Sequence, residues 1–133
     1  MVCTLPYIRQ RRRRVSILGV HEMSVCQALL LQVAEIARQR GAATVDSITV
    51  EIGPLSGVEP EQLRRAFAVM RTGSGSASAE LVIETAAVEV RCLSCGADSE
   101  TLVNRLVCRA CGGFRTRLIA GDELRLRRIE LRN

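Results

Sequence analysis

A chain of 133 residues, 47% of them hydrophobic, suits one globular domain or one domain with a small appendage. No apolar run approaches the roughly 20 residues of a membrane-spanning helix, so we expect a soluble protein. The net charge of +5 would suit nucleic-acid binding, but it is confined to residues 1–19, which hold five Arg and no acid. Residues 20–133 hold 14 Arg and 14 acidic residues, and are neutral.

The first predicted helix follows His21, the only histidine of the chain. Ser24 and Gln27 form an S-x-x-Q capping box, which predicts that the helix begins there. Gly41 predicts its end, because glycine readily takes the left-handed conformation that closes many helices. Apolar residues recur at helical spacing between these limits and predict one buried face: Cys26, Leu29, Leu30, Val33, Ile36 and Ala37.

The middle of the chain predicts strand, helix and strand. Ile48, Val50 and Ile52 alternate with polar residues, which is typical of a half-buried strand. Pro60 suits the first turn of a second helix, because its missing amide hydrogen would have no partner there. We expect that helix to end at Gly73 and residues 80–90 to form one strand. The apolar face of the second helix is predicted to be Leu63, Ala66, Phe67 and Met70.

The C-terminal segment predicts a long strand whose apolar residues are Leu124, Leu126, Ile129 and Leu131. The alternation changes parity across Arg127-Arg128, so we expect a β-bulge there. Such a strand cannot bury itself and should return to the earlier sheet. The expected fold is therefore α+β, with two helices packed on a small, mainly three-stranded β-sheet. We assign residues 20–90 plus 120–133 to this domain and residues 91–119 to an inserted ribbon.

The inserted segment carries two C-x-x-C pairs separated by 12 residues, Cys92–Cys95 and Cys108–Cys111. Each pair is followed by a glycine, and together they can direct four thiolates at one centre. Four soft thiolates in a tetrahedral array favour zinc, and such a saturated site is structural. Two disulfides and a rubredoxin-like iron site are the alternatives, the latter implying an electron-transfer protein.

A zinc ribbon can also bind nucleic acid, which is the alternative function. The segment has an excess of Arg, but four thiolates on Zn²⁺ add about −2 and offset much of it. Phe114 is its only aromatic residue for stacking on a base. No catalytic constellation can be assembled around His21, so we expect no enzyme activity.

Four segments in order resemble the HypA/HybF family of hydrogenase nickel-incorporation proteins: "VHEMS", "VEIGPLSGVEPEQLRRAF", the two C-x-x-C pairs and "GDELRLRRIEL". The resemblance implies a cytoplasmic nickel metallochaperone that carries Ni(II) and Zn(II), with a structural or regulatory zinc site. Its implied partners are a HypB-type GTPase, the [NiFe] hydrogenase large subunit precursor and urease maturation factors. It implies that the protein binds neither nucleic acid nor membranes. It also implies a monomer or a weak homodimer.

The resemblance also implies the nickel ligands. Members of this family begin Met-His-Glu, which corresponds to Val20, His21 and Glu22 here. The implied ligands are the His21 imidazole, the Glu22 residue mainly through its backbone, and the backbone amine of residue 20. A planar set of nitrogens of this kind favours Ni(II) or Cu(II). Val is what a GTG start codon encodes internally, so we interpret residues 1–19 as an over-predicted start or, alternatively, a disordered basic leader.

Overall fold

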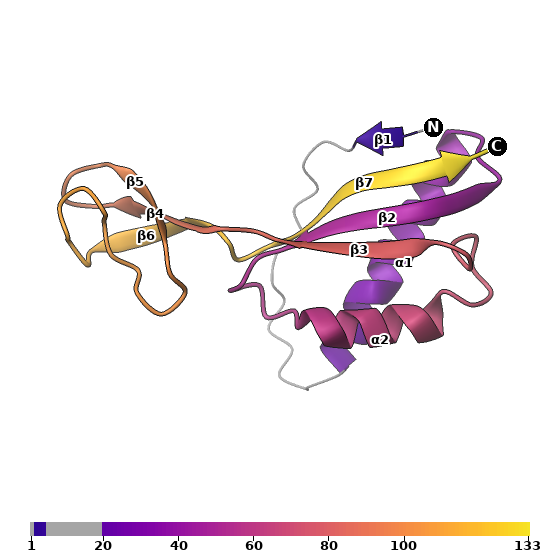
Figure 1. Ribbon diagram of the computed structural model, residues 1–133, viewed down its shortest axis with the longest axis horizontal. Helices are drawn as coiled ribbons and strands as arrows, with labels where there is room; N and C mark the ends of the chain where they lie inside the picture. The colour runs from indigo at the N-terminus through magenta and orange to yellow at the C-terminus, as the bar shows by residue number, and fades with distance from the viewer. Residues whose placement is uncertain (1, 5–19) are drawn as a thin grey trace.

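The computed structural model describes residues 2–4 and 20–133, with side chains from Glu22 onward. It contains two sheets and two helices in an elongated arrangement, with the sheets at opposite ends (Figure 1). The α+β class expected from the sequence is confirmed. The elements are β1 (Val2–Thr4), α1 (Val20–Gln39), β2 (Thr44–Ile52), α2 (Pro60–Met70), β3 (Glu80–Thr85), β4 (Val88–Cys92), β5 (Asp98–Thr101), β6 (Thr116–Ala120) and β7 (Leu124–Arg132).

The main sheet has the strand order β1-β7-β2-β3. Its β7, β2 and β3 are the three predicted strands, and β3 runs parallel to β2 after the α2 crossover. The strand β1 was not expected, and it pairs antiparallel with the outer side of β7. We interpret residues 1–19 as a leader, and the other residues of that segment, 1 and 5–19, lie outside the described part of the chain.

α1 begins at Val20, so the prediction that it begins at the Ser24 capping box is wrong. The capping-box pattern lies inside the helix, and Glu22 supplies the first-turn carboxylate that favours a helix N-terminus. The predicted end is confirmed. Gly41 has a φ of 67°, and the amide of Ala42 donates to the carbonyl of Ala37 at 3.0 Å, which closes the helix with a Schellman motif.

α2 begins at Pro60, as predicted, and ends at Met70 rather than at Gly73. Arg64 of α2 donates to the carbonyl of Leu81 in β3 at 3.3 Å, and Arg71, the residue that caps the helix, donates to the carbonyl of Ala79 just before β3 at 3.2 Å. These guanidinium groups hold the helix against the strand at the edge of the sheet.

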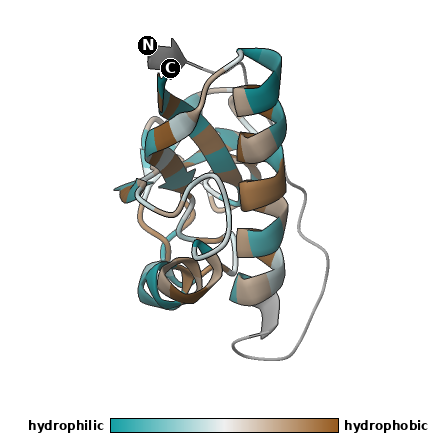
Figure 2. Ribbon diagram, turned by 90° about the vertical axis from the view of Figure 1, so that its right-hand side faces the viewer, coloured by the Kyte–Doolittle hydropathy of each residue, from teal (hydrophilic) through white to brown (hydrophobic). Residues whose placement is uncertain are grey.

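The core is formed by apolar residues of the main sheet and of both helices, and the apolar segments of the strands and of α1 are brown in Figure 2. The predicted apolar positions supply most of this core, which includes the fully buried Leu29, Val33, Ile48, Val50 and Leu63. No helix in the described residues is long and apolar enough to span a membrane.

The predicted β-bulge is confirmed. Thr49 pairs with Arg128 and Val50 pairs with Leu126, so Arg127 is an extra residue in β7. The bulge returns Ile129 and Leu131 to the face that buries Leu124 and Leu126.

Residues 80–90 do not form one strand, contrary to the prediction. β3 ends at Thr85, and β4 begins at Val88 in a second sheet with the order β5-β4-β6. We call residues 88–120, which carry this second sheet, the ribbon. Where the chain passes between the sheets, the backbones approach closely: a Cβ atom on Gly53 would lie 2.2 Å from the carbonyl oxygen of Gly121. Only glycine fits Gly53's position without moving the neighbouring backbone.

Deletion of residues 122–133 is expected to unfold the main sheet. Burial of each of four aliphatic side chains of β7 is worth ~1.5–3 kcal/mol, which together approaches the whole stability of ~5–15 kcal/mol of a typical domain. Far-ultraviolet circular dichroism during thermal unfolding measures the effect. An unchanged melting temperature in the shortened chain would contradict the packing of β7 between β1 and β2.

Candidate metal centre

The cysteines of the two C-x-x-C pairs converge in the ribbon, as the sequence predicted. Their Sγ atoms all lie within 4.8 Å of one another. The closest sulfur atoms belong to different pairs: Cys92 and Cys111 are 3.6 Å apart, and Cys95 and Cys108 are 3.5 Å apart. A tetrahedral ion with Zn–S bonds of about 2.3 Å requires sulfur atoms about 3.8 Å apart. The donor set therefore fits zinc, and the four thiols are free rather than joined as disulfides.

Each pair forms a tight knuckle in which backbone amides point at a sulfur atom. In the first knuckle, the amides of Ser94 and Cys95 both donate to Cys92 Sγ at 3.4 Å. In the second, the amide of Ala110 donates to Cys108 Sγ at 3.3 Å. The glycine after each pair, Gly96 or Gly112, has a positive φ, which allows the turn. These amides stabilise negative charge on the two buried sulfur atoms.

The thiol pKa is lowered in the first cysteine of each pair and raised in the second. The amide of Cys111 is the main cause that lowers the pKa of Cys108 to about 6, and the Cys95 and Ser94 amides lower the pKa of Cys92. The Ala97 amide acts to lower the pKa of Cys95, but the neighbouring thiols of Cys108 and Cys92 outweigh it and raise that pKa to about 12. Four thiolates this close repel one another, so full deprotonation needs a cation such as Zn²⁺ between them.

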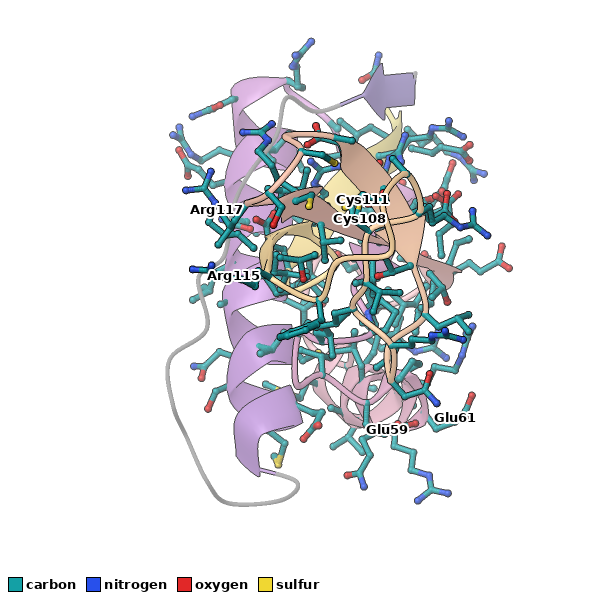
Figure 3. All side chains as sticks on the ribbon, turned by 90° about the vertical axis from the view of Figure 1, so that its left-hand side faces the viewer. Glu59, Glu61, Cys108, Cys111, Arg115 and Arg117 are labelled. Carbon is teal, nitrogen blue, oxygen red and sulfur yellow. The ribbon has the colours of Figure 1, made fainter. Side chains whose placement is uncertain are left out.

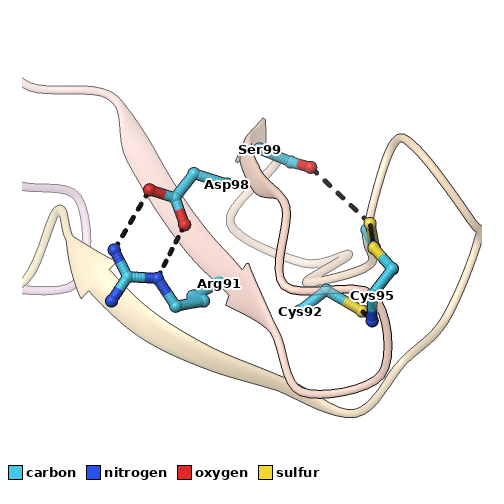
Figure 4. A network of polar contacts seen from close by, with 6 residues as sticks. Arg91, Cys92, Cys95, Asp98 and Ser99 are labelled. Atoms are coloured by element: carbon cyan, nitrogen blue, oxygen red, sulfur yellow. Dashed lines mark hydrogen bonds and ion pairs between the residues drawn. The ribbon is translucent and has the colours of Figure 1, made fainter.

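Two polar contacts support the centre from β5 (Figure 4). The Ser99 hydroxyl lies 3.9 Å from Cys108 Sγ and accepts from the amide of Arg109 at 3.0 Å. Arg91 of β4 and Asp98 of β5 form a two-bond ion pair, at 2.9 Å and 3.2 Å, next to the first knuckle. The role of Ser99 was not predictable, because a serine in a short alternating strand belongs to no ligand motif.

The beginning of α1 carries the other predicted site residues. Val20 and His21 form its first turn, and the structure describes their backbone only. Glu22 is 5% exposed, and its Oε1 accepts from the amide of Glu59 at 3.3 Å, immediately before α2. Its Oε2 is buried without a hydrogen-bond partner in the described part of the chain. The sequence did not predict this contact, because 37 residues separate its two partners.

The two groups of predicted site residues are separate. The cysteines lie in the ribbon, whereas the first turn of α1 lies with the main sheet and near the beginning of α2 (Figure 1). Seen from the end of the ribbon, Cys108 and Cys111 lie centrally, while Glu59, immediately before α2, and Glu61 of α2 lie toward the lower edge (Figure 3). The remaining cysteine with a described side chain, Cys26, is fully buried in the core, and burial raises its pKa to about 11. It is therefore a packing residue.

An α+β fold with a four-cysteine ribbon centre defines a small metal-binding protein. Residues 20–131 match the family described as HypA, hydrogenase/urease nickel incorporation, metallochaperone. The chain belongs to this family, and its function is that of a nickel metallochaperone in hydrogenase maturation. Nickel is the cargo, and the ribbon cysteines fit a zinc site. The nucleic-acid-binding alternative is not favoured.

Individual relatives agree with this assignment over most of the chain. Hydrogenase maturation factor HypA of Nitrosospira multiformis is 43% identical over 112 residues, which are 84% of this chain and 97% of that protein. The same factor of Aquifex aeolicus is 37% identical over 112 residues, with the same coverage. The solution structure of the Ni metallochaperone HypA from Helicobacter pylori superposes with a TM-score of 0.66 at 26% identity, and covers 84% of this chain and 97% of that one.

Proposed function

We propose that the chain binds one Ni(II) ion at the beginning of α1, through the His21 imidazole and the backbone nitrogen atoms of residues 20–22. The observation that carries this proposal is that α1 begins at Val20. The first amides of a helix have no intrahelical acceptor, so the backbone nitrogen atoms of His21 and Glu22 are available to a metal ion. With an imidazole they supply the planar nitrogen donors that Ni(II) favours.

In this proposal, Glu22 contributes a backbone nitrogen atom, while its side chain positions the turn. The carboxylate is buried and already accepts from the amide of Glu59 at the N-terminal end of α2. Positive charge at the end of α2 favours a carboxylate in this place. The contact ties the first turn of α1, where nickel would bind, to the second helix.

Substitutions of Glu22 separate these two roles. Glu22→Gln retains a side-chain oxygen that can accept from the Glu59 amide, so nickel affinity should stay within about threefold. Glu22→Ala removes the acceptor of the Glu59 amide, at a cost of about 0.5–1.5 kcal/mol for a lost hydrogen bond, so the turn should loosen and affinity should fall by about tenfold. Calorimetric nickel titration and thermal unfolding measure both effects. An equal loss of affinity in both variants would instead show that the carboxylate is itself a nickel ligand.

We further propose that the chain delivers nickel to the [NiFe] hydrogenase large subunit precursor together with a HypB-type GTPase, in the cytoplasm and without catalysis of its own. Urease maturation factors are a second set of recipients in this proposal. The chain acts as a monomer or a weak homodimer. Transfer of radioactive nickel from the loaded chain to the purified precursor, with and without the GTPase, tests this proposal. Transfer no faster than from free nickel at the same concentration would refute it.

The proposed role of the zinc centre is structural. The four thiolates leave no open coordination position for a substrate, and the centre holds together a ribbon whose short strands bury few apolar residues. Residues 20–90 plus 120–133 and residues 91–119 remain our proposed domains, and the close approach of Gly53 to Gly121 lies next to the boundary at residue 120.

A further inference from the structure

A second feature of the ribbon lies apart from the cysteine centre. A cavity of about 340 Å³ opens between β5 and the segment that follows it, and its volume falls in the lower part of the range of ligand pockets. The Arg109 amide bonded to Ser99 Oγ and the pairing of Leu102 with Arg105 hold that segment beside the strand. The lining residues are Glu100, Thr101, Leu102, Arg105, Val107 and Arg109.

The cavity has an excess of positive charge. Arg105 and Arg109 line it with Glu100 as the only acidic residue. Among the described residues neither arginine forms an ion pair, in contrast to Arg91, whose guanidinium is bonded to Asp98. Guanidinium groups are suited to bind carboxylates through paired hydrogen bonds.

The walls of the cavity also suit a polypeptide backbone. β5 is an edge strand, and within the described chain no strand pairs with its outer side. Thr101 Oγ1 is buried and has no hydrogen-bond partner among the described residues. Leu102, which also lines the cavity, is 69% exposed, and its neighbour Val103 is 47% exposed. Edge strands with adjacent apolar side chains are a common place for an extended peptide to add as a further strand.

We propose that this cavity binds an extended acidic segment of a partner protein. The segment adds along the outer edge of β5, its carboxylates pair with Arg105 and Arg109, and an apolar side chain of the segment covers Leu102. A nucleic acid fits this cavity less well, because no aromatic residue lines it for stacking on a base. The proposal goes beyond nickel binding, since it concerns the ribbon and assigns it a role in partner recognition.

The test uses the zinc-loaded full chain and a short fluorescent peptide of alternating glutamate and valine. Fluorescence anisotropy should show saturable binding of this peptide and none of a version with glutamine for glutamate. The double variant Arg105→Glu, Arg109→Glu should bind the acidic peptide about tenfold or more weakly, because charge-assisted hydrogen bonds are lost. Both residues are exposed, so zinc content and melting temperature should be unchanged.

Arg117→Glu is the matched control. It reverses one arginine charge, as each of the two substitutions in the double variant does, but on β6, which lies at the opposite edge of the same sheet (Figure 3). This variant should bind the acidic peptide within about twofold of the unchanged chain. A lysine-valine peptide should bind the double variant better than the unchanged chain, and Arg105→Gln gives a milder test if the double variant loses zinc.

Three results would overturn the proposal: absence of binding to the acidic peptide, equal binding by the double variant, or an equal loss in Arg117→Glu, which would indicate unspecific attraction to the basic chain. Competition by a single-stranded oligonucleotide that depends on Arg105 and Arg109 would assign the cavity to nucleic acid instead. Slower hydrogen exchange of the amides of residues 98–102 in the peptide complex would support addition at the β5 edge.

Discussion

A His21→Ala variant is expected to lose tight nickel binding and to keep its zinc and its fold. The substitution removes the one imidazole in the chain, and backbone nitrogen atoms alone hold Ni(II) weakly at neutral pH. The residue lies in the first turn of α1, before Cys26, the first buried apolar residue of the helix, so the core should not change. Isothermal calorimetry with nickel measures the loss. Zinc analysis and the melting temperature are the controls, and undiminished nickel affinity would show that the site lies elsewhere.

The state of the nitrogen atom of residue 20 is expected to matter as much as the imidazole. In a chain that begins at position 20 with Met, this atom is an amine with a pKa of about 8, which loses its proton far more readily than an amide. In the 133-residue chain it is an amide. The shorter chain should therefore bind nickel about tenfold or more tightly at neutral pH. Equal affinities would show that the terminal amine is not a ligand.

The sequence predicted those parts of the fold that depend on periodicity and on turn chemistry. The parity change at Arg127-Arg128 located the bulge, because each residue added to a strand reverses the faces of all that follow. Gly41 located the end of α1, since a left-handed residue is required there. Both features are local, so a single sequence contains the whole signal.

The errors arose where a tertiary contact overrides a local pattern. The Ser24 capping box is a valid local motif, but the helix extends past it to Val20, and Glu22 packs against the beginning of α2. The break at Ala86 and Ala87 was missed although the buried positions change parity there, from Leu81 in β3 to Val88 and Val90 in β4. Such a change can mark a bulge within one strand or a break between two, and it does not indicate which sheet each strand joins. Gly53 and Gly121 approach closely where the chain passes between the two sheets, and the sequence does not indicate that these two glycines are neighbours.

The metal centre was predictable because its ligands are rare residues at a fixed spacing. The polar contacts that support the centre were not predictable, because Ser99, Arg91 and Asp98 are common residue types whose role depends on their position next to the knuckles. The same holds for the cavity beside β5. Arg105 and Arg109 contribute to the excess of Arg in this segment, but the sequence does not indicate that both line one cavity beside β5.

Replacement of a ribbon cysteine is expected to release zinc and loosen the ribbon while α1 and the main sheet remain folded. Cys95→Ser leaves three thiolates and a position open to water, so zinc affinity should fall by about tenfold or more. The loosened region should extend over residues 91–117, because the centre joins both knuckles and few apolar residues are buried there. Zinc analysis after dialysis against a chelator and limited proteolysis measure the two effects.

The matched control is Cys26→Ser, which also removes one thiol, but from the core packed on α1. That variant should lower the melting temperature and keep full zinc content, the opposite pattern to Cys95→Ser. Cys108→Ser should exceed both in its effect on zinc. Its sulfur is buried, accepts from the Ala110 amide and has a pKa lowered to about 6, so it is the thiolate most readily available to the metal at neutral pH. Full zinc content and unchanged proteolysis in Cys95→Ser would contradict the four-cysteine centre, whereas equal zinc loss in all three variants would show that zinc binding reports the stability of the whole fold.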